Sequence, residues 1–234
     1  MIMRILMLAA LALPAPALAA DRVVGVGSFS RVRIEGGFEV RIVAGSPRAR
    51  ISGERDAIEA IDLHVDGTTL VVRRATNGTW SERPVAADRA PIVIALATPA
   101  LENSLVVGGS RVEIARMAGR RVGVTVTGTG AVTVASTRAD LLVAQVIGSG
   151  SIALAGTATN ARLSINGPGT IDAATLDAGD VVVRNDGLGT TNARARYTAT
   201  VDNVGLGSVT IAGNAKCTVR AAAGGPVACG RTLR

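Results

Sequence analysis

The chain has 234 residues, is 48% hydrophobic and only 2% aromatic, and carries a formal net charge of +7. Its length suits one elongated domain or at most two. Nearly all of the positive charge is arginine, because Lys216 is the only lysine, and no run of adjacent arginines exceeds two. Aromatic residues do not alternate with these arginines as a platform for stacking bases requires, so the composition argues against a nucleic-acid-binding protein.

Residues 1–20 have the features of a cleavable signal peptide. Arg4 gives a positive start, an apolar run follows over residues 5–13, and Ala17-Leu18-Ala19 is a small-residue cleavage pattern. The apolar run is too short to cross a bilayer, and no later stretch reaches the roughly 18 uninterrupted apolar residues of a membrane helix. We therefore expect an exported protein without a transmembrane span, located in the periplasm, secreted or held at the cell surface.

Residues 21–105 are predicted to form an irregular β region. Apolar and polar residues alternate in several short stretches, which is the period of strands with one buried face. The apolar members are Val32 and Ile34; Phe38, Val40 and Ile42; Leu63 and Val65; Leu70 and Val72; and Ile92, Ile94 and Leu96. One helical turn is expected over residues 56–61.

A polar segment at residues 75–90 contains Trp80, the only tryptophan. The segment is predicted to be a projecting loop. Trp80 either anchors a partner from this loop or folds back on the fold as a lid. It is a weak candidate for a contact residue.

From residue 106 onward a glycine motif recurs about every twenty residues. The leading glycines are Gly108, Gly128, Gly148, Gly167, Gly187 and Gly205, at intervals of 20, 20, 19, 20 and 18 residues. Apolar residues occur at even offsets from each glycine, which indicates short strands joined by corners, and the glycines mark a corner that needs positive φ or close backbone approach. A propeller blade would need about twice this period. We therefore predict an all-β fold, a single-stranded β-helix (β-solenoid) over residues 106–234, with the region 21–105 packed on it.

Two asparagines interrupt the apolar pattern. Asn185 and Asn203 occupy the same inward position in successive coils. We expect a structural ladder in which the stacked amides hydrogen-bond along the solenoid, the alternative being a binding site.

The two cysteines, Cys217 and Cys229, lie near the C-terminus. In an oxidising compartment the simplest interpretation is a disulfide that caps the last coil. A metal site would need further ligands, and His64, the only histidine, lies in a different part of the chain. No metal and no cofactor are expected.

The ordered combination of these motifs resembles the head GIN domain family of putative autotransporter adhesins. The resemblance covers residues 28–229. It lies in the repeated Gly-X-Gly corners and in Phe29-Ser30-Arg31-Val32-Arg33-Ile34, Gly37-Phe38-Glu39-Val40-Arg41-Ile42 and Leu70-Val71-Val72. The resemblance implies a right-handed β-helix in a bacterial envelope or secreted protein, and it brings no catalytic or ligand-binding residues.

Three functions suit such a solenoid: a non-catalytic, adhesion-like module that binds an envelope polymer or protein, a structural protein that self-associates, and a polysaccharide lyase or hydrolase. The enzyme would need paired carboxylates, or a base with a cation, on one face. Its candidate acids fall at different offsets in different coils, at Asp140, Asp172, Asp177 and Asp180. We therefore expect a non-catalytic module, with the polysaccharide-active enzyme as the alternative.

Overall fold

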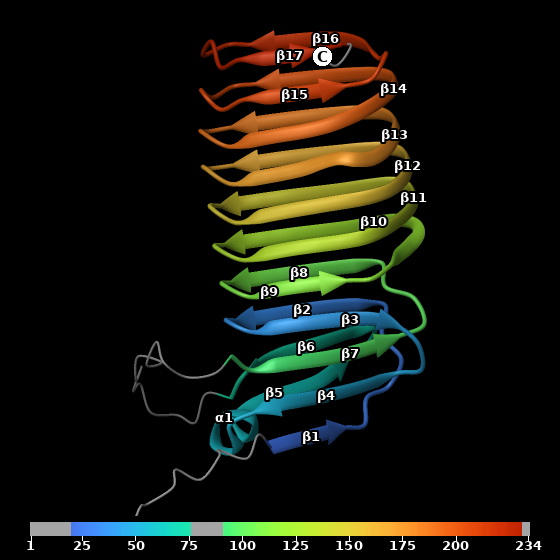
Figure 1. Cartoon of the computed structure of the whole chain (residues 1–234), viewed down its shortest axis with the longest axis vertical. Helices are drawn as coiled ribbons and strands as arrows, with labels where there is room; N and C mark the ends of the chain where they lie inside the picture. Colours follow the sequence, from blue (N-terminus) through green and yellow to red (C-terminus); the bar gives the residue numbers. More distant parts are fainter. Residues whose placement is uncertain (1–19, 76–90, 231–234) are drawn as a thin grey trace, which may run out of the picture.

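The computed structural model describes residues 20–75 and 91–230. Trp80 and residues 1–19 of the predicted signal peptide lie outside this part of the chain. The fold is nearly all β and forms a solenoid of about six turns, closed at its C-terminal end by the Cys217–Cys229 disulfide (Figure 1). The predicted fold class and the predicted disulfide are thus confirmed.

The regular coils are stacked by parallel pairing between successive turns. Val126, for example, pairs with Val106 of the preceding coil and with Val146 of the following one. The strands of these coils are β8 (Asn103–Gly108), β9 (Arg111–Ile114), β10 (Met117–Gly128), β11 (Ala131–Gly148), β12 (Ser151–Asn166), β13 (Thr170–Asp186), β14 (Thr190–Asn203), β15 (Val209–Ala212), β16 (Lys216–Ala221) and β17 (Val227–Cys229). Side chains therefore form columns along the axis, one residue from each coil.

One coil in the stack comes from a distant part of the sequence. It consists of β2 (Arg31–Gly36) and β3 (Glu39–Ala44). In Figure 1 this coil lies between the one formed by β6 (Thr69–Arg74) and β7 (Val93–Thr98) and the one formed by β8 and β9. The register agrees, because β2 pairs in parallel with both β6 and β8, and β3 with both β7 and β9. The order of the coils in space therefore differs from their order in the chain.

The N-terminal end of the stack is irregular and partly antiparallel. It contains β1 (Ala20–Val24), β4 (Arg48–Gly53), the short helix α1 (Arg55–Glu59) and β5 (Ile61–Asp66). Antiparallel pairs join β4 to β7 and β1, and β5 to β6. Arg22 of β1 donates to the carbonyls of Ile58 and Ile61, which ties this outermost strand to the α1 region. These elements cover the strand edge that a parallel stack would otherwise leave open.

The core consists of apolar columns inside the coils. One column runs from Ile34 through Val106, Val126, Val146 and Ile165, and all five are at most 1% exposed. Burying a side chain of this size contributes roughly 1.5–3 kcal/mol. The alternate residues face solvent, because successive side chains of a strand point to opposite faces. Among residues 20–75 and 91–230, the side chains accessible to a partner are those of these outward columns and of the corners.

Candidate functional site

The corner glycines stack directly on one another. Gly108, Gly128, Gly148, Gly167 and Gly187 have φ between +104° and +134°. A Cβ atom at Gly148 would lie 2.7 Å from the carbonyl oxygen of Gly128. Gly205 has no positive φ, but the approach there is tighter, since a Cβ would lie 2.0 Å from the carbonyl oxygen of Gly187. The corners are therefore filled by backbone and serve to stack the coils.

Asn185 and Asn203 are fully buried and face each other in register. Each Nδ2 donates within its own coil, to the carbonyl of Gly189 at 3.0 Å and of Gly207 at 2.8 Å, respectively. The expected amide-to-amide hydrogen bonds are not formed, and neither Oδ1 atom accepts a hydrogen bond from a described residue. Each amide instead donates to a backbone carbonyl of its own corner, and that carbonyl would otherwise lack this hydrogen bond. The two asparagines thus brace the corners.

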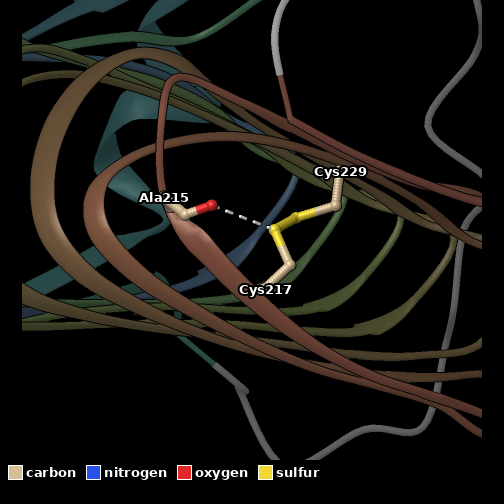
Figure 2. Close-up of a disulfide and its surroundings, with 3 residues drawn as sticks. All are labelled: Ala215, Cys217 and Cys229. Atoms are coloured by element: carbon tan, nitrogen blue, oxygen red, sulfur yellow. Dashed lines mark hydrogen bonds between the residues drawn. A yellow bond between two sulfur atoms is a disulfide. The ribbon is translucent and has the colours of Figure 1, made fainter.

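The disulfide joins the two strands of the last coil, β16 and β17 (Figure 2). The Cα atoms of Cys217 and Cys229 are 6.4 Å apart, and both side chains are half-buried. This terminal coil has few neighbours, since most residues of β16 are exposed. The covalent link therefore compensates for the small core of the last turn.

Three of the four acidic residues considered for an enzyme are engaged locally, whereas Asp140 lines the cavities described below. Asp177 accepts an ion pair from Arg196 at 3.5 Å, Asp180 accepts a hydrogen bond from Thr198, and Asp172 accepts one from the backbone N–H of Ala174. Within residues 20–75 and 91–230, no group of three His, Cys, Asp or Glu residues could hold a metal ion. These contacts are those of surface residues that shape turns and strand ends.

The structure brings together a set of arginines that are scattered in the sequence. Arg120, Arg138 and Arg196 line a cavity of about 500 Å³. Arg31, Arg120 and Arg121 line a second cavity of about 660 Å³. Both cavities are lined by Arg120 and Asp140, so the two cavities adjoin each other at these residues. We call the two cavities together the arginine groove and define it by these five arginines.

The strand register explains why these arginines point outward. Arg138 pairs with Ala118 in the preceding coil and with Thr157 in the next, so the three side chains form one column. The neighbouring residues Met117 and Ala139 are buried, which fixes the alternation. The small residues Ala118, Gly119, Ala139 and Ala158 also line the cavity, so its floor is recessed between the long arginine side chains.

The arginine groove has an excess of positive charge. Its five arginines face only two lining carboxylates, Glu102 and Asp140. Arg196 is paired with Asp177, but the other four arginines make no ion pair within the described part of the chain. Some arginines outside the groove are paired, as Arg41 is with Glu113 at 3.4 Å, and others, such as Arg111 and Arg162, make no ion pair with a described residue. The guanidinium donors in the groove are therefore available to an external anion.

An exposed tyrosine stands beside the groove. Tyr197 is 64% exposed, and the Cζ atom of Arg196 lies 5.4 Å from the centre of its ring. The ring lies against Gly179, where a Cβ would be 3.4 Å from Tyr197 Cδ2 and 2.6 Å from the carbonyl oxygen of Thr159. Thr159 itself lines the groove. An aromatic surface thus adjoins the row of arginines.

Among the described carboxyl groups, Asp62 has a clearly shifted pKa, and it lies at the N-terminal end of the stack. A hydrogen bond from Arg73 is the main cause that lowers the pKa of Asp62, and His64 adds to it. Groups with perturbed pKa values often mark catalytic sites. Here the perturbation belongs to an exposed ion-pair cluster on β5 and β6, away from the groove.

The arginine groove is not evident in the sequence as a run of adjacent arginines, because it collects arginines from different coils. Part of the signal is present, because aligning the coils on their glycines places residues 118, 138 and 157 close to one column. The contribution of Arg31 requires the out-of-order coil, which no period in the sequence shows.

The comparisons with known proteins agree on the fold. A family model described as putative auto-transporter adhesin, head GIN domain, matches residues 28–215. A solved putative adhesin of Bacteroides fragilis is 21% identical, with a TM-score of 0.75 over 91% of this chain and 94% of that one. A putative lipid binding protein of Parabacteroides distasonis is 14% identical, with a TM-score of 0.66 over 91% and 94% of the two chains. A search of curated proteins found no match.

Proposed function

The chain belongs to the head GIN domain family, and from this membership and the charge of its surface we propose that it is a non-catalytic binding module of the bacterial envelope. The arginine groove is the binding face. This assignment agrees with the adhesin descriptions of the family and of the solved structures with the same fold.

The observation that carries the proposal is the row of unpaired arginines in a recess that crosses several coils. A solenoid presents an extended surface suited to long partners. Charged side chains without internal partners can contribute to affinity, because their pairing with a ligand replaces water rather than an existing ion pair. The recess holds guanidinium donors for an anion, and its five arginines outnumber its two carboxylates, Glu102 and Asp140.

Export to the envelope is supported by two features. Residues 1–20 have the positive start, the short apolar run and the small-residue cleavage pattern of a signal peptide. The disulfide suits an oxidising compartment such as the periplasm or the cell exterior. In addition, no helix in the described ranges has the length and apolar character needed to cross a membrane. We therefore assign the protein to the periplasm, the cell surface or the secreted fraction.

The experiment is co-sedimentation of the purified chain with isolated envelope material from a Gram-negative bacterium. Two variants with the same change in net charge are compared: Arg120→Ser with Arg138→Ser in the groove, and Arg41→Ser with Arg184→Ser outside the groove lining, where both arginines are ion-paired. We expect the groove variant to lose binding and the control variant to keep it. Equal binding by all three proteins would exclude the groove as the binding face.

A further inference from the structure

We propose that the arginine groove binds a linear acidic polysaccharide, with arginines pairing to its carboxylate groups and Tyr197 stacking on a sugar ring. This inference rests on the proposed binding function and specifies the ligand class. It follows from the length of the groove, the chemistry of its donors and the position of the tyrosine.

The arginine groove extends over several coils of the solenoid. Arg31 belongs to the β2 coil and Arg196 to the β14 coil, so six coil spacings separate them along the axis. At about 4.8 Å per spacing this is roughly 29 Å. A single small anion would occupy one part of such a site. Charges repeated over this distance instead fit a polymer that carries an anionic group on successive units.

The hydrogen-bond donors of the groove suit carboxylate groups. A guanidinium offers a planar fork of N–H groups that matches the two oxygens of a carboxylate. Arg120, Arg121 and Arg138 come from adjacent coils and make no ion pair with a described residue. Thr157 and Thr159 line the same cavity. Their hydroxyls can both donate to and accept from sugar hydroxyls.

Tyr197 adds an aromatic surface suited to a sugar ring. Its ring is anchored against Gly179, so a large aromatic surface remains fixed and exposed at the edge of the groove. An aromatic ring with a polar tip is suited to contact both the apolar face of a sugar and its hydroxyls. The combination of such a ring with arginines distinguishes an acidic sugar from a simple anion.

Two other polyanions fit less well. A flat bilayer would contact only the rim of the groove. It would not reach the recessed floor, which is lined by small residues such as Ala118 and Ala139. Single-stranded nucleic acid is bound through a series of aromatic side chains that stack on successive bases. The groove has a tyrosine at one end only. Both are included in the test as competing outcomes.

The test measures binding of the purified chain to polygalacturonate by calorimetry. The matched probe is fully methyl-esterified polygalacturonate, which has the same backbone without the charges. Anionic phosphatidylglycerol vesicles and single-stranded oligodeoxythymidine are the other probes. We expect polygalacturonate to bind, with affinity that falls as salt rises, and the methyl ester, the vesicles and the oligonucleotide to bind at least about tenfold more weakly.

Three variants separate a specific site from general attraction. Arg120→Ser with Arg138→Ser should weaken polygalacturonate binding by about tenfold or more, whereas Arg41→Ser with Arg184→Ser should change it less than about twofold. Tyr197→Ala should weaken binding several-fold and Tyr197→Phe should restore it. Thermal unfolding by circular dichroism checks that each variant is folded. If a groove variant does not fold, the comparison of the acid and its methyl ester on the unmodified chain decides the question.

The results distinguish this inference from the proposed function. Equal binding to the acid and its methyl ester, equal loss in both double variants, or stronger binding to vesicles or DNA overturns the acidic-glycan assignment. If the groove variant still loses binding to envelope material in that case, the binding function stands and only the ligand class is wrong. If binding to envelope material is also unaffected, both are wrong.

Discussion

The hydroxyl oxygen of Ser110 accepts a hydrogen bond from the backbone N–H of Phe38 at 3.0 Å, across 72 positions of the chain. The same hydroxyl donates to the carbonyl oxygen of Gly36 at 2.9 Å. One buried side chain thereby holds the corner of the β2–β3 coil against the corner of the β8–β9 coil. Removing this hydroxyl should therefore lower the stability of the whole stack.

We predict that Ser110→Ala lowers the free energy of unfolding by about 1–3 kcal/mol, because the Phe38 N–H is left buried without its partner. Urea unfolding followed by circular dichroism measures this change. Ser149→Ala is the matched control, since Ser149 is an exposed serine at another corner. Equal stability of the two variants would show that the Ser110 hydroxyl does not support the corner.

The corner glycines differ in how much space surrounds them. A Cβ at Gly108 would lie 2.8 Å from the carbonyl oxygen of Gly36, and the φ of Gly108 is +104°, whereas a Cβ at Gly37 would meet no atom within 4 Å. Gly108→Ala should therefore cost roughly 2–4 kcal/mol of stability and Gly37→Ala much less. Chemical unfolding of both variants checks the difference. Similar losses would argue against backbone stacking as the reason for the repeat.

The buried amide of Asn185 gives a prediction that depends on pH. In Asn185→Asp the Nδ2 donor to the Gly189 carbonyl is lost, and a carboxylate buried there has a raised pKa because desolvation disfavours its charge. A protonated carboxyl can still donate to that carbonyl. The raised folded pKa means that the stability of the variant is retained below the unfolded value, about 3.9, and is lost as pH rises through the folded pKa.

Unfolding in urea at pH 4 and at pH 7.5 measures this effect, with the unmodified chain as reference at each pH. The loss in free energy of unfolding caused by Asn185→Asp should be larger at pH 7.5 than at pH 4. Asn192→Asp is the control, because Asn192 is partly exposed on the outer face. A deficit that does not change with pH would mean that the carboxylate reaches solvent.

Removal of the disulfide should act locally. The bond closes a separation of 12 residues, for which the loss of chain entropy corresponds to about 3 kcal/mol. In a stack each coil contacts mainly its neighbours, so Cys217→Ser with Cys229→Ser should release the last coil before the rest unfolds. Hydrogen exchange should accelerate in β16 and β17 and stay unchanged in β11 and β12. Uniform acceleration along the stack would contradict this expectation.

The inward columns could be predicted from the sequence because the repeat of about twenty residues and the two-residue alternation within each strand identify the same positions. Val126 lies two residues before its corner glycine, as do Val106 and Val146, and alternation within each strand decides which side chains are buried. The burial of Asn185 followed from the same rule. Its hydrogen bond did not, because the direction of a side-chain amide depends on which buried carbonyl lies nearest.

The place of the β2–β3 coil could not be predicted from the sequence. The repeat is recognised by the regular spacing of its corner glycines, and this coil lies outside that spacing. Gly36 lies opposite Gly108 in the stack, yet β3–β7 lie between them in the chain. The arginine groove depends on this placement and on the register of the outward columns. Whether Tyr197 is exposed or covered depends on its fit against Gly179, which alternation alone does not decide.

The out-of-order coil has a consequence for how the molecule assembles. In a solenoid whose turns stack in chain order, each turn can pack on the turn that precedes it in the sequence, so folding can propagate along the chain. Here β2 and β3 emerge first but acquire parallel partners only when β6–β9 are present. Such distant pairings slow folding, because long loops must close before the contacts are gained. Because the β2–β3 coil pairs with β6 and β7 on one side and with β8 and β9 on the other, it links the N-terminal strands to the glycine repeats. We therefore expect the two parts of the rod to unfold as one cooperative unit.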